Sequence, residues 1–133
     1  MNDLPVRTLP APAVNPESQP YWAAASDGKL LLGHCKSCGA HHHYPRRICP
    51  FCHAADVEFT EASGLGEIYS YSATLRLSPE PYVIAYVTLA EGPTVLTNIV
   101  DADWEKLAIG QGVRLGFAKC TGGQAAPVFS PIK

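Results

Sequence analysis

The chain has 133 residues, 47% of them apolar and 17% charged, and its formal net charge is −2. This balance is typical of a soluble globular protein with one domain or two very small ones. No apolar run approaches the length of a membrane span and no apolar signal segment opens the sequence, so we expect a cytoplasmic protein without a membrane partner.

Residues 1–17 are predicted to form a proline-rich arm. Five prolines lie within residues 1–20 without apolar periodicity, and such a segment cannot build a core of its own. Ser18 is then a candidate N-cap for a short helix over residues 21–25, which Gly28 would end, and an apolar strand is expected at 30–32. Trp22 in this helix either packs it onto the following module or contacts a ligand.

Four cysteines form two C-x-x-C pairs, Cys35 with Cys38 and Cys49 with Cys52. Each pair turns two sulfurs the same way from a tight knuckle, and two knuckles close a tetrahedron around Zn²⁺ with no open position, which predicts a structural metal. Disulfides or a redox dithiol fit less well, because nothing indicates an oxidising compartment and a redox motif needs one pair. Iron suits the same S₄ cage and stays an alternative. The fifth cysteine, Cys120, is assigned no role.

After the second knuckle the pattern is all β. Strands are predicted near residues 67–75, 82–90, 94–100, 113–118 and 128–130, with turn residues between them. A sheet this small exposes its edges unless it curls into a barrel, and one helical turn within 101–110 would suit an OB-fold. The predicted fold class is mostly β, with a short helix and zinc ribbon over 18–62 and a five-stranded OB-fold barrel over 63–133.

Charge is uneven along the sequence. Residues 28–55 hold four basic and no acidic side chains, whereas the remainder holds six basic and twelve acidic ones. Part of this positive charge balances the net −2 of Zn²⁺ with four thiolates, and Arg46 and Arg47 are candidates for a phosphate-facing patch. Tyr69 and Tyr71 share one face of the first barrel strand by period-two geometry, and either line a groove or belong to the core.

Several short motifs occur in a characteristic order along the chain: Cys35-x-x-Cys38-Gly39, Tyr44-Pro45-Arg46, Cys49-Pro50-x-Cys52 and Gly64-x-Gly66. With the barrel pattern, they make residues 20–131 resemble the acyl-CoA-associated OB-fold family with an N-terminal rubredoxin-like zinc ribbon. The resemblance implies an accessory subunit that helps a thiolase-like, hydratase-like or aldolase partner to handle acyl-CoA. It also implies contacts to coenzyme A or to the partner, for which the candidates are Trp22, Arg46, Arg47, Tyr69 and Tyr71.

The sequence departs from this pattern at His53, where a glycine commonly follows the second knuckle, and we expect a different turn conformation there. No catalytic residue is predicted, because no serine, cysteine or threonine lies in a recognisable nucleophile motif. The chain alone is therefore not expected to be an enzyme.

The main alternative is a nucleic-acid-binding module, since zinc ribbons and OB-folds both occur in such proteins. Residues 63–133 hold only five basic against six acidic side chains, which disfavours a phosphate-binding groove. The barrel tyrosines are expected to be buried rather than free to stack on bases; they are Tyr69, Tyr71, Tyr82 and Tyr86. A stand-alone structural module is a third possibility that the sequence does not separate from the first.

Overall fold

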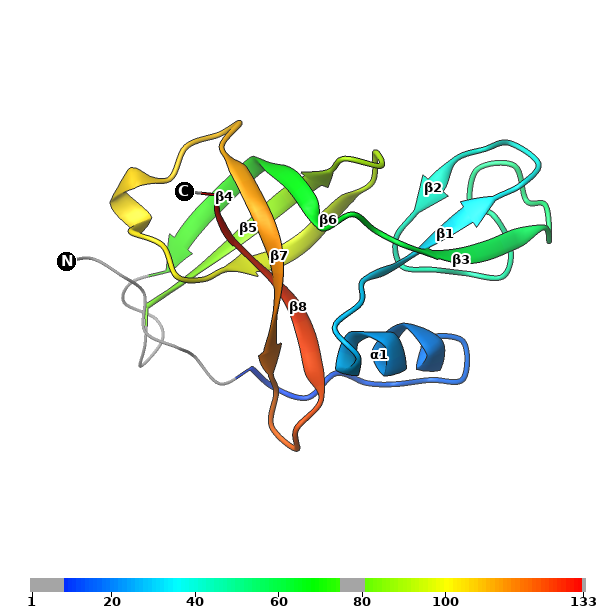
Figure 1. The fold of residues 1–133 in the computed structure, drawn as a ribbon, viewed down its shortest axis with the longest axis horizontal. Helices are drawn as coiled ribbons and strands as arrows, with labels where there is room; N and C mark the ends of the chain where they lie inside the picture. The colour runs from blue at the N-terminus through cyan, green and yellow to red at the C-terminus, as the bar shows by residue number, and fades with distance from the viewer. Residues whose placement is uncertain (1–8, 75–80, 133) are drawn as a thin grey trace.

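The computed structural model describes residues 9–74 and 81–132, and Figure 1 shows a helix near the N-terminus, a small sheet and a barrel. Helix α1 (Gln19–Ser26) comes first. The small antiparallel sheet has the order β2-β1-β3, formed by β1 (Leu31–Cys35), β2 (His41–His42) and β3 (Val57–Glu61). The closed barrel has the order β4-β5-β6-β8-β7, formed by β4 (Leu65–Thr74), β5 (Tyr82–Leu89), β6 (Thr94–Ile99), β7 (Gly112–Lys119) and β8 (Ala125–Pro131).

The predicted architecture is confirmed. All five barrel strands lie where the alternating pattern placed them, although β8 is longer than expected, and the predicted residue Leu75 lies outside the described part of the chain. A single 3-10 turn (Trp104–Lys106) connects β6 to β7, as an OB-fold requires. None of the helices in the described part is both long and apolar enough to span a bilayer.

Helix α1 ends at the predicted glycine, but the predicted N-cap residue does not cap it with its side chain. Gly28 adopts φ 79° and its amide donates to the carbonyl of Ala25 at 3.0 Å, which closes the C-terminus. Ser18 occupies the N-cap position, but its side chain makes no capping bond to the helix. Its hydroxyl instead donates to the Asn15 carbonyl at 3.3 Å, so it stabilises the preceding turn.

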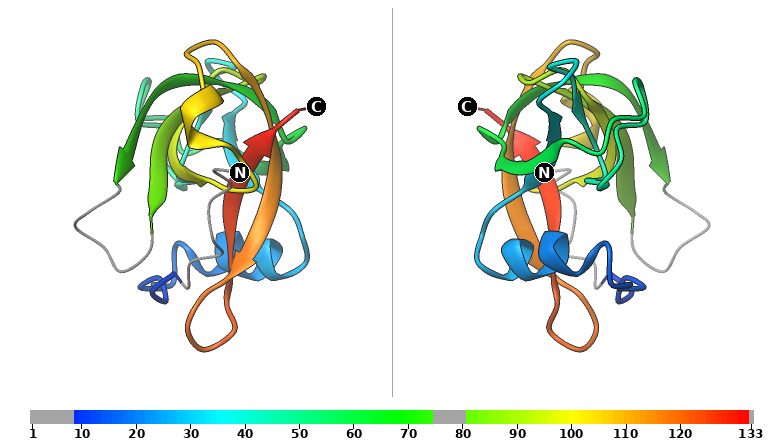
Figure 2. Two further views of the ribbon diagram at one scale, coloured as in Figure 1. Left: turned by 90° about the vertical axis from the view of Figure 1, so that its left-hand side faces the viewer. Right: turned by 90° about the vertical axis from the view of Figure 1, so that its right-hand side faces the viewer.

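The end of the proline-rich arm contacts the barrel. Leu9 forms an isolated β-bridge with Cys120, and its carbonyl accepts the amide of Thr121 at 2.9 Å. Burial of Cys120 raises the pKa of its thiol and makes it part of this packing. Figure 2 shows α1 beside the lower part of β8, so the arm and the helix both lie against the β7–β8 side of the barrel.

One hydrophobic core joins the helix, the ribbon and the barrel. Tyr21 of α1, together with Leu30 and Leu32 around β1, belongs to the same buried cluster as Val95 and Phe129 of the barrel. The parallel pairing of β6 with β8 is confined to Ile99 and Phe129, and both residues belong to this cluster. The ribbon is therefore packed onto the barrel rather than tethered to it by a linker alone.

Candidate functional site

The four predicted metal ligands converge. Their sulfur atoms all lie within 4.8 Å of one another, with 3.5 Å between Cys35 and Cys52 and 3.7 Å between Cys38 and Cys49. A tetrahedral site with metal–sulfur bonds of about 2.3 Å has sulfur–sulfur separations of about 3.8 Å. The cage therefore has the size that a tetrathiolate metal needs. Cys35 and Cys49 are buried, whereas Cys38 and Cys52 face the surface.

The two knuckles share one backbone geometry. The amide of Gly39 donates to the Cys35 carbonyl at 2.8 Å, and the amide of His53 donates to the Cys49 carbonyl at 3.0 Å. Gly39 has φ 80° and His53 has φ 64°, so both adopt the left-handed conformation. The expected difference at His53 was wrong, because the hydrogen bonding of the knuckle fixes the turn even where the side chain makes it less favourable.

Hydrogen bonds from backbone N–H groups favour the thiolate form of the cysteines, which is the form that binds a cation. The N–H groups of Cys52 and Phe51 lower the pKa of the Cys49 thiol to about 6. At Cys52 the amide of Ala54 favours the thiolate, but the other three sulfurs and burial outweigh it and raise the pKa to about 12. Four thiolates this close repel one another unless a metal ion lies among them, so the donor set fits a metal centre.

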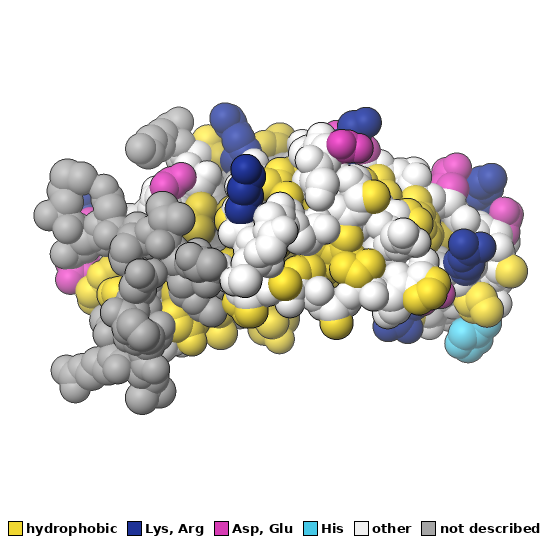
Figure 3. Space-filling view, turned by 90° about the horizontal axis from the view of Figure 1, so that it is seen from below, with side chains coloured by type: hydrophobic (Ala, Val, Ile, Leu, Met, Phe, Trp, Pro, Cys, Tyr) yellow, Lys and Arg dark blue, Asp and Glu magenta, His cyan; other side chains and the backbone are white. Residues whose placement is uncertain are grey.

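The ribbon surface carries mixed charge, which corrects the expectation of a basic patch. Strand β3 pairs with β1 and brings Glu58 against His34, whose Nδ1 lies 2.9 Å from the carboxylate. The imidazole hydrogen bond lowers the pKa of Glu58. Figure 3 shows basic and acidic side chains next to one another at the ribbon end of the molecule. The acidic and basic side chains of the ribbon lie in separate stretches of the sequence, and the antiparallel pairing of β1 with β3 brings them together.

A buried histidine fixes the loop that follows β2. His42 is 4% exposed, and its Nε2 accepts the backbone N–H of Arg46 at 3.1 Å. Burial lowers the pKa of His42, so the ring is neutral and carries its hydrogen on Nδ1, which has no hydrogen-bond partner in the described structure. Gly33 lies opposite, and a Cβ there would fall on the ring. This contact sets the path of residues 43–46.

That loop and α1 form an aromatic cluster around Tyr21. Its ring centroid lies 4.9 Å from Trp22, 5.1 Å from Tyr44 and 5.4 Å from His43, and its hydroxyl oxygen lies 3.0 Å from His43 Nε2. Burial raises the pKa of Tyr21 and lowers the pKa of His43 to about 4, so the pair is a neutral phenol and imidazole. The cluster packs the helix against the ribbon.

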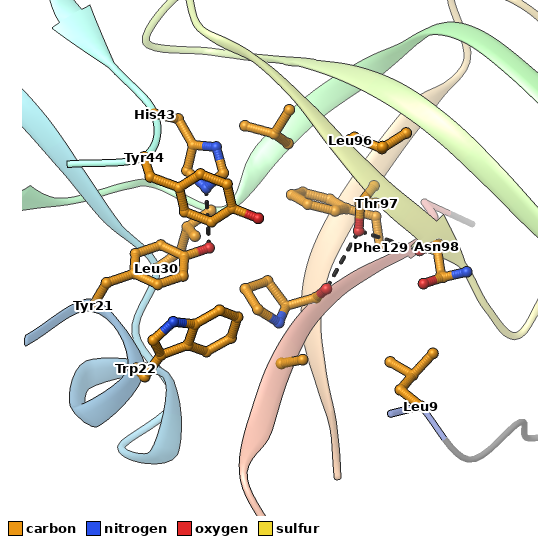
Figure 4. A pocket seen from close by; sticks show the side chains of 13 residues that line it. Leu9, Tyr21, Trp22, Leu30, His43, Tyr44, Leu96, Thr97, Asn98 and Phe129 are labelled. Atoms are coloured by element: carbon orange, nitrogen blue, oxygen red, sulfur yellow. Dashed lines mark hydrogen bonds between the residues drawn. The ribbon is translucent and has the colours of Figure 1, made fainter. Parts of the chain in front are cut away.

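Two hollows meet at this cluster, and Trp22 and Tyr44 line both. The outer hollow, about 380 Å³, lies between the end of the arm, α1 and the loop after β2, and Glu17 and Arg46 also line it. The inner hollow, about 130 Å³, reaches the barrel at Leu96 and is shown in Figure 4. Trp22 is thus both a packing residue and a wall of a potential binding site.

The other predicted contact residues are placed elsewhere. Arg47 is exposed on the ribbon and does not line either hollow.

Tyr69 lies at a β-bulge in β4, where the register shifts between residues 68 and 70. The bulge breaks the period of two, so Tyr69 is 67% exposed while Tyr71 donates its hydroxyl to the Leu107 carbonyl at 2.8 Å. The two tyrosines do not share a face, and neither belongs to the buried core.

Sequence reasoning missed Tyr21, His43 and Tyr44 as neighbours of Trp22. The only signal was that aromatic pairs occur both before the first knuckle and between the two. Nothing in the sequence placed these two segments in contact.

Comparison with known proteins agrees with this geometry. Residues 22–58 match the rubredoxin-like zinc ribbon domain of ChsH2, and residues 59–118 match the C-terminal OB-fold domain of ChsH2. A chain of a solved Ltp2-ChsH2(DUF35) aldolase superposes with a TM-score of 0.79 and 33% identity, covering 91% of this chain and 98% of that one.

Curated relatives match as well. A DUF35 domain-containing scaffold protein of Methanocaldococcus jannaschii is 34% identical over 106 residues, or 74% of each chain. A probable enoyl-CoA hydratase alpha subunit of Thermomonospora curvata is 33% identical over 131 residues, which is 96% of this chain but only 41% of that protein. From its metal cage, its barrel and these matches, the chain belongs to the ChsH2-type DUF35 family, in which a rubredoxin-like zinc ribbon precedes an OB-fold domain.

Proposed function

We propose that this chain is a non-catalytic accessory subunit that binds one structural zinc ion and helps a partner enzyme to handle acyl-CoA or a related thioester. The observation that supports it most is the near-complete match to a chain of the Ltp2-ChsH2(DUF35) aldolase. The relatives named as a scaffold protein and as a hydratase subunit point the same way. A thiolase-like, hydratase-like or aldolase partner would supply the chemistry.

The metal centre supports this division of roles. A metal ion held by four thiolates has no open coordination position for a substrate, so it stabilises the ribbon and does not act as a Lewis acid. We assign the site to zinc, since tetrahedral thiolate cages select zinc or iron and the ribbon is of the kind named after zinc. Elemental analysis of purified protein separates the two metals.

The outer hollow is our candidate for the coenzyme A contact. Trp22 and Tyr44 offer aromatic walls for a flat adenine or a narrow pantetheine arm, and Arg46 offers a cation for a phosphate. Arg46 is exposed and has no ion-pair partner in residues 9–74 or 81–132. Glu17, in the same hollow, would accept hydrogen bonds from a ribose hydroxyl or the adenine amino group, which places the phosphate toward Arg46.

The proposal is tested by purifying the tagged chain from its own cells, with and without nuclease treatment, and identifying proteins that co-purify. We expect an enzyme of acyl-CoA or thioester chemistry in stoichiometric amount, unaffected by nuclease. Bound coenzyme A released by denaturing the complex would support the ligand role. Recovery of nucleic acid with its binding proteins, and of no such enzyme, would overturn the proposal.

One observation favours the nucleic-acid alternative more than we expected. Tyr69 and Tyr86 are 67% and 48% exposed on the barrel, whereas the sequence suggested burial, so they are free to stack on bases. The electrostatic argument against this role still holds, because β5 and β6 contain no charged residue. The nuclease arm of the same purification decides between the two.

A further inference from the structure

An apolar face covers the outside of the barrel over three neighbouring strands. Four side chains form what we call the β5–β6 face: Tyr69 from β4, Ile84 and Tyr86 from β5, and Leu96 from β6. Their exposed fractions are 67%, 40%, 48% and 57%, respectively. Tyr86 lies directly opposite Leu96 in the ladder, and Ser70, next to Tyr69, lies opposite Tyr86. The four residues therefore form one contiguous patch.

This face differs from the other exposed sheet surfaces of the chain. An antiparallel sheet usually places polar side chains on its solvent side. The ribbon strand β3 follows that rule with Glu58, and β7 does so with Arg114. By contrast, β5 and β6 alternate buried core residues with outward isoleucine, tyrosine and leucine, and they carry no charge. Large exposed apolar patches in soluble proteins mark interaction sites.

The face is continuous with the candidate ligand site. Leu96 belongs to the β5–β6 face and also lines the inner hollow, whose other side is formed by Trp22 and Tyr44 (Figure 4). A protein that covered the face would therefore lie at the mouth of the hollows. For an accessory subunit this is the useful arrangement, because a thioester held at Trp22 and Tyr44 could extend directly into the partner's active site.

The composition of the face selects the kind of occupant. These strands are the second and third of the barrel, a face that OB-folds use for oligonucleotides. Phosphates need several lysine or arginine contacts, and this face has none. The core of a protein–protein interface is instead depleted in charge and enriched in tyrosine and other large apolar residues. We infer that the β5–β6 face docks onto an uncharged, apolar surface of the partner enzyme subunit, an inference that rests on the proposed function.

The test compares charged variants in the full chain. Tyr86→Lys with Leu96→Lys places two cations on the face, while Ile109→Lys, at a position 72% exposed in the β6–β7 connection, is the matched control. Metal content and melting temperature are measured for each variant to show that both fold. We expect the double variant to recover at least tenfold less enzyme from cells than the wild type, and the control to recover a similar amount.

A photo-cross-linking amino acid at position 86 or 109 gives an independent readout. We expect a cross-link to the enzyme subunit from position 86 and not from position 109. Full enzyme recovery by the double variant would refute the docking face while leaving the proposed function intact. A cross-link from position 86 to a second copy of this chain or to nucleic acid would also refute it. A wild-type chain that recovers no such enzyme would refute the proposed function itself.

Discussion

Replacement of Gly33 by alanine is the sharpest probe of how the ribbon positions its loop. Gly33 lies opposite His42 in the pairing of β1 with β2, and a Cβ at this position would fall on Nε2, Cε1 and Cδ2 of the imidazole. The ring is 4% exposed and its Nε2 holds the Arg46 amide at 3.1 Å. It cannot move aside without breaking that bond and displacing residues 43–46.

The expected cost has two parts. Overpacking a filled core costs about 1–3 kcal/mol, and loss of a hydrogen bond to a buried group adds about 1–3 kcal/mol. We therefore expect Gly33→Ala to lower the free energy of unfolding by roughly 2–6 kcal/mol. For a chain of this length that is a drop in melting temperature of roughly 6–24 °C.

The assay is thermal and urea unfolding of the metal-loaded protein, with metal release to a chelator followed in parallel. Gly116→Ala is the control, because its new Cβ would meet Val128 Cγ2 at 3.9 Å, an ordinary contact. The double variant Gly33→Ala/His42→Ala should lose less stability than the sum of its single variants, since the clash is removed. Equal melting of the Gly33 and Gly116 variants would refute this account of the loop.

Four further predictions concern the metal, the turn, the ligand and pH. Cys49→Ser should abolish binding of the single metal ion per chain and unfold the ribbon, as elemental analysis and circular dichroism would show. His53→Gly should raise the free energy of unfolding by about 1 kcal/mol, because it removes a left-handed side chain, and no gain in urea denaturation would contradict this. Arg46→Ala should weaken coenzyme A binding by the purified complex at least fivefold in calorimetry, whereas Arg114→Ala should not. Because burial holds the pKa of His43 near 4, against about 6.5 when unfolded, stability should fall by up to about 3 kcal/mol as pH drops from 6.5 to 4. His43→Asn should flatten that part of the stability curve.

Most of the fold could be predicted because the signals were local. The C-x-x-C spacing identifies the four ligands, and the period of two with turn residues locates the barrel strands. Strand β3 was missed because Val57–Glu61 is short and begins soon after the second knuckle, with only residues 53–56 between them. Its pairing with β1 also explains why the ribbon is not a basic patch, since only that contact brings Glu58 beside His34.

The candidate ligand site could be predicted only in part. Trp22 and Arg46 were identified from the sequence and do line one hollow, but its other walls come from segments whose contact depends on tertiary packing. The placement of Tyr69 failed for a different reason. A bulge inserts one residue into β4. Beyond that point, each side chain lies on the face opposite to the one that the alternating pattern predicts.

The narrow pairing of β6 with β8 has a consequence for how this protein can be divided. The barrel has a seam there, and Tyr21 and Leu30 join the core that meets barrel residues Val95 and Phe129 along it. The ribbon and the barrel thus share part of one hydrophobic core, and a barrel separated from its ribbon would expose those core residues to water. A hybrid that joins the ribbon of one relative to the barrel of another would have to exchange both sides of the seam together.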